Sequence, residues 1–174
     1  MTLLPYEQLI YKSPLSAQEL HQKLKEAVEV GPAGSKLSVV KKKTDKPYRG
    51  EVSAIRFDIV RQINYRNSFL PRITGQIHPQ GSGCTIKVKM QLHPFVLIFM
   101  LFWFGILFSI GGTIMANGFD TPGGSWQGAI PVLMLLFGYA LVMGGFKTES
   151  RKAKKELATI FNAKKDPFGR KGFY

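Results

Sequence analysis

The sequence predicts an α+β protein in three parts: a small antiparallel sheet with a packed helix, an α-helical transmembrane hairpin, and a C-terminal amphipathic helix. Two observations lead to this prediction. Several short stretches in residues 1–93 alternate apolar and polar side chains, as half-buried strands do. Residues 94–146 contain two apolar runs without Asp, Glu, Lys, Arg or His, PFVLIFMLFWFGILFSIGGTIMA and GAIPVLMLLFGYALVMGGF. A run of about 18 such residues can cross a hydrocarbon layer about 30 Å thick as a helix.

The apolar runs divide the chain into a cytosolic α+β domain at 1–93, a hairpin at 94–146 with spans at about 95–115 and 128–146, and a basic helix and tail at 147–174. The first part holds 15 Lys/Arg against 7 Asp/Glu (net +8), and the last holds 9 against 3 (net +6). Between the spans, the loop 117–127 has one charged residue, Asp120. Because basic flanks stay in the cytoplasm, we expect a multi-pass protein of the cell (inner) membrane with both termini cytoplasmic.

The N-terminal part begins with an expected strand at 6–12, followed by an amphipathic helix at about 17–29. Ser16 and Glu19 fit a capping box, in which each side chain satisfies a free backbone amide at the start of a helix. The dipeptide Gly31-Pro32 is a stop signal for this helix. The helix is therefore expected to pack its apolar stripe against a sheet.

Four further strands are expected at 36–40, 53–65, 72–78 and 84–92. The segment 41–47 reads as a charged turn, 66–71 as a break and 79–83 as a turn. Because these connections are short, we expect neighbouring strands to be antiparallel. Arg61 is an exception to the alternating pattern, since it falls on the apolar face of its strand. An arginine in that place needs a partner, either a glutamate or a bound anion.

Small residues four positions apart occur in both spans, as the pairs Gly105/Ser109, Gly112/Ala116 and Ala140/Gly144. Such pairs let helices approach closely in lipid, so they predict close packing either within the hairpin or between copies of the chain. Pro94 is expected at the start of the first span, where its missing amide has no helical partner. Trp126 is expected at the outer membrane interface.

The segment after the second span predicts an amphipathic helix at about 148–163, either separate from that span or continuous with it. Its apolar stripe is Ala153, Leu157, Ile160 and Phe161. The stripe either packs on the sheet or lies in the headgroup layer of the membrane. Five basic residues beside the span are candidates for contact with anionic headgroups: Lys147, Arg151, Lys152, Lys154 and Lys155.

The stretch RQINYRNSFLPR at 61–72 mixes arginines with aromatic and amide side chains. It reads either as an exposed strand–turn–strand junction or as a contact surface for a partner or an anion. The residues of the second interpretation are Arg61, Tyr65, Arg66, Asn67 and Arg72.

Residues for catalysis or metal binding are sparse. The three histidines are dispersed without metal-ligand spacing, and Cys84 falls on the inward side of a strand, where a lone cysteine usually belongs to the core. No phosphate-binding glycine loop and no nucleophile motif occurs. The sequence therefore predicts no enzymatic activity, no metal and no cofactor. A nucleic-acid partner is not expected either, because topology and lipid attraction already account for basic residues beside spans.

The order strand, helix, antiparallel strands, long final helix resembles a reduced helix-grip (START-like) domain, with the hairpin 94–146 inserted before the final helix. In that family a curved sheet wraps the helix around a cavity for lipids or other apolar ligands. The stretch from Tyr65 to Pro94 also looks like that of uncharacterised bacterial proteins with two membrane spans. This resemblance implies a bacterial inner-membrane location and no known activity.

These features favour a non-enzymatic interaction or scaffold module, an integral membrane protein that presents a small basic cytosolic domain at the bilayer surface. The expected partners are membrane lipids, especially those with anionic headgroups, and a second copy of the chain or another membrane protein. The alternative is a protein that binds a lipid or small apolar ligand in a START-like cavity. An apolar cavity of a few hundred Å³ between sheet and final helix would favour that alternative.

Overall fold

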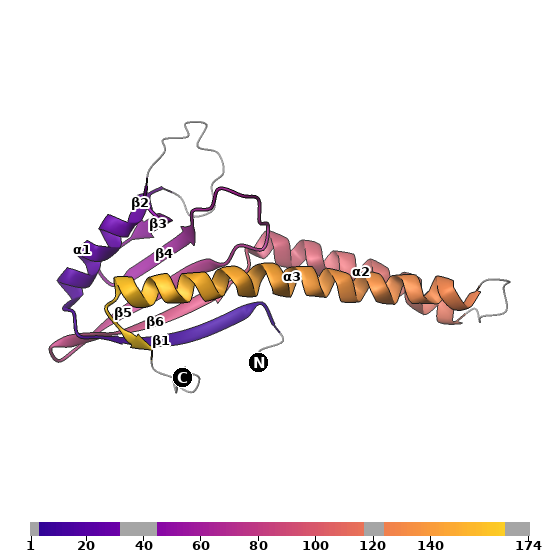
Figure 1. Cartoon of the computed structure of the whole chain (residues 1–174). Coiled ribbons are helices and arrows are strands. Elements are labelled where there is room, and N and C mark those ends of the chain that lie inside the picture. The colour runs from indigo at the N-terminus through magenta and orange to yellow at the C-terminus, as the bar shows by residue number, and fades with distance from the viewer. Residues whose placement is uncertain (1–3, 32–44, 117–123, 166–174) are drawn as a thin grey trace.

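The computed structural model describes residues 4–31, 45–116 and 124–165 and shows an α+β protein. The side chains of residues 115, 124–128, 164 and 165 are not described. In chain order the elements are β1 (Tyr6–Ser13), α1 (Ala17–Ala27), β2 (Val28–Val30), β3 (Tyr48–Val52), β4 (Arg56–Arg61), β5 (Arg72–Gln80), β6 (Gly83–Gln91), α2 (Pro94–Ala116), α3 (Gly124–Ile160) and β7 (Lys164–Lys165). Figure 1 shows α2 and α3 running side by side away from one end of the sheet.

The strands of the described chain form one sheet in the order β2-β3-β4-β5-β6-β1-β7. Strand β1 pairs with β6 along its whole length, from Tyr6 opposite Gln91 to Ser13 opposite Cys84. Strands β3 to β6 form antiparallel neighbours, and this confirms the predicted antiparallel pairing for β4 with β5 and for β5 with β6. The prediction that all neighbours are antiparallel is wrong at β2, which runs parallel to β3. Parallel pairing is open to β2 because the 17 residues 31–47 separate it from β3, its neighbour in the sheet.

Helix α1 begins at the predicted capping box, since Ser16 and Glu19 satisfy each other's backbone amides. It ends at Ala27, two residues earlier than predicted, because Val28 takes an extended conformation and opens β2. β-branched residues favour such an extended, half-buried place. The edge pairing of β2 with β3 therefore replaces the last helical turn.

The segment predicted as one strand at 53–65 is instead the second arm of a hairpin, β3–β4. Strand β4 stops at Arg61, and β3 was missed. The missed strand has an irregular centre at Gly50, whose φ is +154°. A side chain at this position would lie 2.1 Å from the carbonyl oxygen of Asp58, so only glycine fits. The predicted strand at 36–40 lies outside the described residues.

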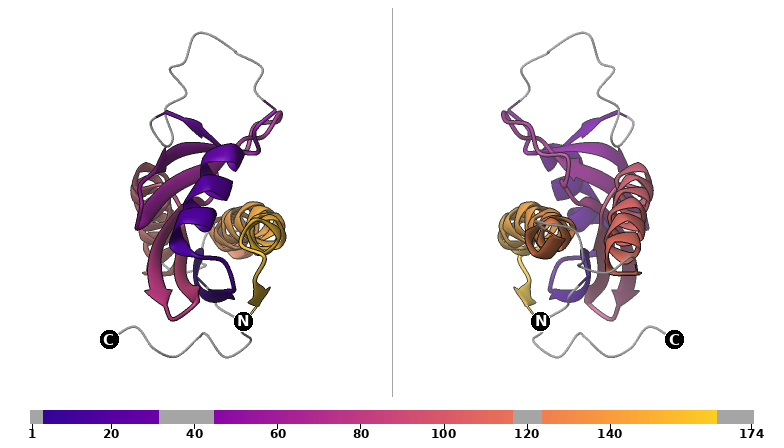
Figure 2. Two further views of the ribbon diagram at one scale, coloured as in Figure 1. Left: turned by 90° about the vertical axis from the view of Figure 1, so that its left-hand side faces the viewer. Right: turned by 90° about the vertical axis from the view of Figure 1, so that its right-hand side faces the viewer.

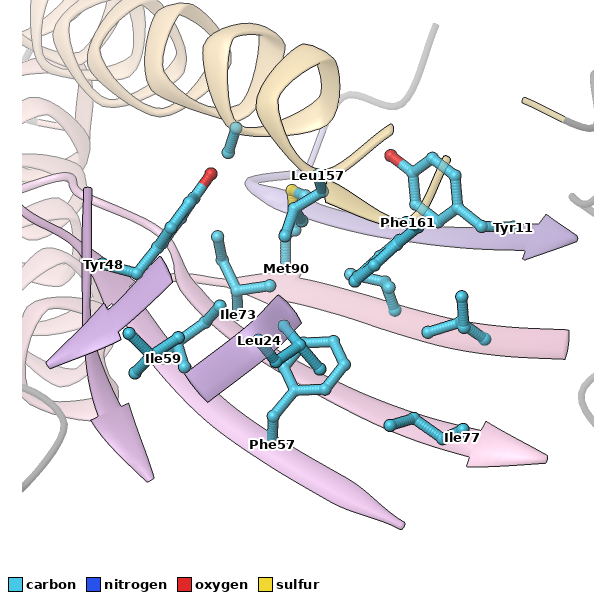
Figure 3. Packing of buried hydrophobic residues seen from close by; sticks show 14 of the residues in the cluster. Tyr11, Leu24, Tyr48, Phe57, Ile59, Ile73, Ile77, Met90, Leu157 and Phe161 are labelled. Atoms are coloured by element: carbon cyan, nitrogen blue, oxygen red, sulfur yellow. The ribbon is translucent and has the colours of Figure 1, made fainter. Parts of the chain in front are cut away.

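The core lies between the inner face of the sheet and two helices, α1 and the far half of α3 (Figure 2). Helix α1 contributes Leu20 and Leu24, and α3 contributes Ala153 and Leu157, all with no exposed surface. Just past α3, the Phe161 ring meets the rings of β1 and β4 edge-on or tilted, as Figure 3 shows. Of the two arrangements that the sequence left open for the apolar stripe of 148–163, the structure has the one packed on the sheet.

Helix α3 is a single helix of 37 residues that includes the second apolar run and then continues onto the sheet. Helices α2 and α3 are each long and apolar enough to cross a membrane, and 11% and 22% of their apolar windows are buried. A core helix of a soluble domain would instead be mostly buried. We call α2 together with α3 up to Phe146 the apolar hairpin.

The contacts within the apolar hairpin correct one prediction. A Cβ atom at Gly138 would lie 3.2 Å from the Phe104 ring, and one at Gly111 would lie 3.6 Å from Pro131. At Gly105, Gly112 and Gly144, by contrast, a Cβ atom would meet no described atom within 4 Å. The glycines of the predicted small-residue pairs therefore do not pack within the hairpin, and their use between copies stays a prediction.

Candidate functional site

The candidate site lies where the sheet, α3 and the apolar hairpin meet. Arg61 ends β4 on the inner face of the sheet, two positions after the buried Ile59. Above it, α3 presents Glu149 and Glu156, which are two helical turns apart and therefore share a face. The alternation of β4 and the periodicity of α3 thus bring one guanidinium between two carboxylates.

Arg61 binds both carboxylates through separate edges of its guanidinium. Its Nη1 donates to Glu149 Oε2 at 3.0 Å, and its Nη2 donates to Glu156 Oε1 at 2.7 Å. Its Nε lies 3.1 Å from each oxygen of Glu156. The hydrogen bond to Glu156 is the main reason that the pKa of Arg61 is raised. A planar fork with fixed donors is suited to such a double contact.

Two tyrosines complete the carboxylate contacts. The Tyr48 hydroxyl donates to Glu156 Oε2 at 2.8 Å, and the Tyr65 hydroxyl donates to Glu149 Oε1. Burial and the neighbouring Glu156 raise the pKa of Tyr48, so it stays a donor. Burial alone would raise the pKa of Glu149, but hydrogen bonds from Tyr65, Lys152 and Arg61 hold it below its ordinary value. Glu149 is therefore a buried anion whose charge is fully compensated.

The charges of this network balance. Lys152 Nζ lies 3.3 Å from Glu149 Oε1 and 3.3 Å from the Tyr65 hydroxyl. These two hydrogen bonds raise the pKa of Lys152, that of Tyr65 contributing most. Two cations, Arg61 and Lys152, thus face the two anions Glu149 and Glu156. We call these four residues with Tyr48 and Tyr65 the junction network.

A second ionic contact ties the opposite side of α3 to β1. Glu7 pairs with Lys154 and accepts a hydrogen bond from the Ser150 hydroxyl at 2.6 Å. Further along β1, the Tyr11 hydroxyl donates to the carbonyl of Lys154 at 3.3 Å. Burial, with Glu7 nearby, raises the pKa of Tyr11 to about 12. Helix α3 is thus held by polar contacts on both flanks of its apolar stripe.

The structure separates the residues predicted as a partner or anion contact. Arg61 and Tyr65 belong to the junction network, so Arg61 has the glutamate partner that the sequence allowed for. Arg72 instead pairs with Asp58 on the outer face of the sheet, with its Nε 2.8 Å from Oδ1. The amide of Asn67 donates to the carbonyl of Gly145 at 3.4 Å and accepts from the Phe69 amide. Arg66 is exposed.

The basic residues predicted to touch headgroups occupy different faces of α3. Arg151 and Lys155 are exposed and Lys147 is half-buried, whereas Lys152 and Lys154 are engaged with Glu149 and Glu7. At 1.5 Å per residue, Lys155 lies about 14 Å beyond Phe146 along the helix axis, and Arg151 about 8 Å. Trp126 lies in the first turn of α3, but its side chain is outside the described residues.

Sequence reasoning missed Glu149, Glu156 and Tyr48. A signal existed for the two glutamates, because they stand four positions before and three positions after Ala153 and so share its face of the helix. The two acids interrupt an apolar helix stripe, and the arginine interrupts an apolar strand face. Because their charges are opposite, each interruption could have been the partner of the other. Pairing them required the expectation that the final helix covers the sheet.

The junction network has no free nucleophile and no open acid–base pair, because each carboxylate is already held by two or more donors. Among the described residues, no group of three His, Cys, Asp or Glu could hold a metal ion. Cys84 is buried, and this burial raises the pKa of its thiol. The geometry is that of a structural clamp between a sheet and a helix.

No family model matches the chain, and no curated protein or solved structure is significantly similar to it.

The Glu149→Gln variant should flatten the acid limb of the pH–stability curve. Because the folded-state pKa of Glu149 lies below its ordinary value of 4.5, the folded state binds fewer protons than the unfolded state. The contribution of Glu149 to the free energy of unfolding is therefore complete above about pH 4.5 and is lost as the pH falls through the folded-state pKa. At neutral pH we expect the free energy of unfolding of the variant to be about 1–3 kcal/mol lower than that of the wild type. On acidification the variant should then lose less of its free energy of unfolding than the wild type does.

Chemical unfolding of the detergent-solubilised protein, followed by near-ultraviolet circular dichroism, measures both effects. Glu26→Gln is the matched control, because Glu26 is exposed on α1 and accepts a hydrogen bond only from Gln22 among the described contacts. An acid limb as steep in Glu149→Gln as in the wild type would contradict the role given to Glu149.

Proposed function

We propose that this chain is a non-enzymatic membrane protein of the bacterial inner membrane that presents its α+β domain to the cytoplasm as an interaction or scaffold module. The apolar hairpin crosses the bilayer, and both termini stay in the cytoplasm. The domain is held against the membrane in one orientation. Its exposed surface then offers a docking site for another protein at a fixed height above the lipid.

The observation that carries this proposal is the continuity of α3. One half of the helix is apolar and outward-facing, while the other half fills the core of the sheet. A flexible linker would let the domain tumble, whereas a continuous helix clamped by Arg61 transmits the orientation of the hairpin to the sheet. Fixed presentation suits a scaffold that holds a partner near the membrane.

The outer face of the sheet is the proposed contact surface. No residue on this face of β4, β5 or β6 is buried, in contrast to the inner face. An open hollow of about 640 Å³ lies there, lined mainly by charged and polar side chains. Both signs of charge are present, as in Arg56, Asp58, Lys87 and Lys89. A mixed-charge surface of this kind favours a protein partner over a uniformly charged polymer.

The net positive charge of the two flanks supports headgroup contact as a second, weaker tether. Lys147 and Arg151 are the best placed of the five basic candidates, because they follow the apolar hairpin within about two helical turns. Lys155 lies farther from the hairpin than the screening length of about 8 Å at physiological salt. The lipid contact therefore adds to the anchoring rather than defining the function.

The alternative of an apolar ligand inside a START-like cavity has less support. The space between the sheet and α3 is filled by side chains without exposed surface, among them Tyr11, Tyr48, Ile73, Met90 and Leu157 (Figure 3). The hollows described in this chain lie on the outer face of the sheet and along the apolar hairpin instead.

Cysteine labelling tests the membrane topology. The only natural cysteine, Cys84, is 3% exposed, so the background labelling is low. A membrane-impermeant maleimide should label Lys155→Cys from the cytoplasmic side only and Asp120→Cys from the outer side only. Cys84→Ala in both variants controls for the natural thiol. Labelling of both positions from one side would contradict a hairpin that crosses the bilayer, and the reverse pattern would contradict the proposed orientation.

A second labelling experiment tests the interaction module. Gln76→Cys lies on the outer face of the sheet. In native membranes the maleimide should react with it about tenfold more slowly than in purified protein, because a partner present at about ten times its Kd leaves about one tenth of the sites uncovered. Lys155→Cys, on the exposed face of α3, should react at similar rates in both. Equal rates for Gln76→Cys in membranes and in pure protein would show that no partner covers this face.

A further inference from the structure

A crevice opens where the polar domain meets the apolar hairpin, and its lining changes from polar to apolar. It has a volume of about 600 Å³. Its polar lining, which we call the mouth, consists of Asn67 and Ser68 of the β4–β5 loop together with Arg72 and His93. We call it the entry crevice. No carboxylate lines it, although Asp58 binds Arg72 from one side.

The apolar part of the lining of the entry crevice is exposed. It is formed by Phe69 and by the first turns of α2, with Phe95, Val96 and Phe99. Phe95 and Phe99 are 72% and 53% exposed, an arrangement that would be costly in water but suits lipid. The crevice therefore combines hydrogen-bond donors and exposed aromatic rings within a single hollow.

A second hollow continues the first toward the hairpin interior. It has a volume of about 330 Å³, lies between α2 and α3, and shares Phe69 and Phe99 with the entry crevice. Its other lining side chains, including Trp103, Phe137 and Leu141, are apolar. Trp103 lies about 14 Å along α2 from Pro94, which is close to the end of an acyl chain in a leaflet about 15 Å thick. The two hollows together form a path from polar to apolar.

Arg72 and His93 each keep a donor that the described contacts do not use. Arg72 gives its Nε and Nη2 to Asp58, so within the described part of the chain its Nη1 makes no hydrogen bond. Asp58 thus fixes the guanidinium without using all its donors. The Nδ1 of His93 accepts the Phe95 amide at 3.3 Å, which leaves Nε2 as the donor. Because both side chains line the same crevice, each can offer a donor to a phosphate bound there.

We propose that the entry crevice and the hollow beyond it hold one molecule of an anionic phospholipid. Its phosphate meets Arg72 and His93, and one acyl chain follows Phe95 and Phe99 to Trp103. The donors at the mouth, with no carboxylate in the lining, favour a phosphate over an apolar ligand, and the apolar continuation favours a lipid over a soluble anion. The proposal rests on the membrane insertion of the apolar hairpin, and it adds a specific lipid site to the general headgroup contacts of α3.

Quenching of Trp103 by brominated lipids tests this site. The full-length Trp126→Phe variant, in which Trp103 is the only tryptophan, is reconstituted in phosphatidylcholine bilayers with a minor fraction of phosphatidylglycerol. Bromine is placed on the acyl chains of one lipid or the other. We expect the quenching to show that phosphatidylglycerol is enriched next to Trp103 about fivefold over its bulk fraction. This is the change in binding that one partly exposed ion pair contributes.

Substitutions locate the effect. Arg72→Gln should abolish the enrichment, whereas Arg56→Gln, which removes an exposed arginine on the same sheet face, should leave it unchanged. Because Arg72→Gln also frees Asp58 and can loosen the sheet, His93→Gln serves as a second variant that keeps that ion pair, and it should lower the enrichment about twofold. Added glycerol phosphate should not displace the lipid.

The outcomes separate this proposal from the membrane proposal. No quenching by either brominated lipid would contradict insertion of the hairpin itself. Quenching by the two brominated lipids in proportion to their bulk fractions would keep the insertion and overturn the specific site. Displacement by glycerol phosphate, or an equal effect of Arg56→Gln and Arg72→Gln, would overturn it as well.

Discussion

The inner face of the sheet cannot be closed without the far half of α3, and this requirement shapes the molecule. Helix α1 has only 11 residues and supplies two fully buried leucines. Further cover comes from Ala153 and Leu157 near the end of α3, a helix that includes the second apolar run, and from Phe161 just past that helix. The same helix therefore has one apolar, outward-facing half that is long enough to cross a membrane and one half that fills a protein core.

Polar contacts decide how the helix sits on the sheet. An apolar stripe alone tolerates rotation and sliding, because hydrophobic burial has no direction. Arg61 between Glu149 and Glu156 fixes both the rotation and the height of α3, since a shift of one residue would turn the two carboxylates away. A buried ion pair of this type adds little net stability when compared with apolar substitutes, and its documented use is to fix register. This is our hypothesis for the junction network.

Much of the fold could be predicted because its signals are local. The capping box at Ser16 and Glu19, the alternation of β6 and the two apolar runs each need only a few neighbouring residues. The missed parts depend on distant partners. Strand β3 has Gly50 at its centre and β2 has three residues, so neither has a pattern long enough to detect, and their pairing is decided by tertiary contacts.

Only part of the candidate site could be predicted from the sequence, again because local patterns can be detected and distant partners cannot. Arg61 stood out, because a charge on an apolar strand face breaks a local pattern. Its partners Glu149 and Glu156 lie 88 and 95 residues away, across the whole apolar hairpin. Tyr48 gave no signal, since a tyrosine at a strand end is ordinary. The small-residue pairs suggested packing within the hairpin that their glycines do not make, because spacing alone does not tell which face of a span meets its neighbour.

Hydrogen exchange of the sheet in two matched variants of α3 tests the central claim most directly. Leu157 is fully buried on the sheet, whereas Leu133 is 62% exposed on the apolar hairpin. If α3 completes the core, Leu157→Ala should destabilise the domain by about 2–5 kcal/mol and speed the exchange of amides in β4, β5 and β6 by about 30-fold or more. Leu133→Ala should leave these amides unchanged. Equal protection of the sheet in both variants would contradict the account.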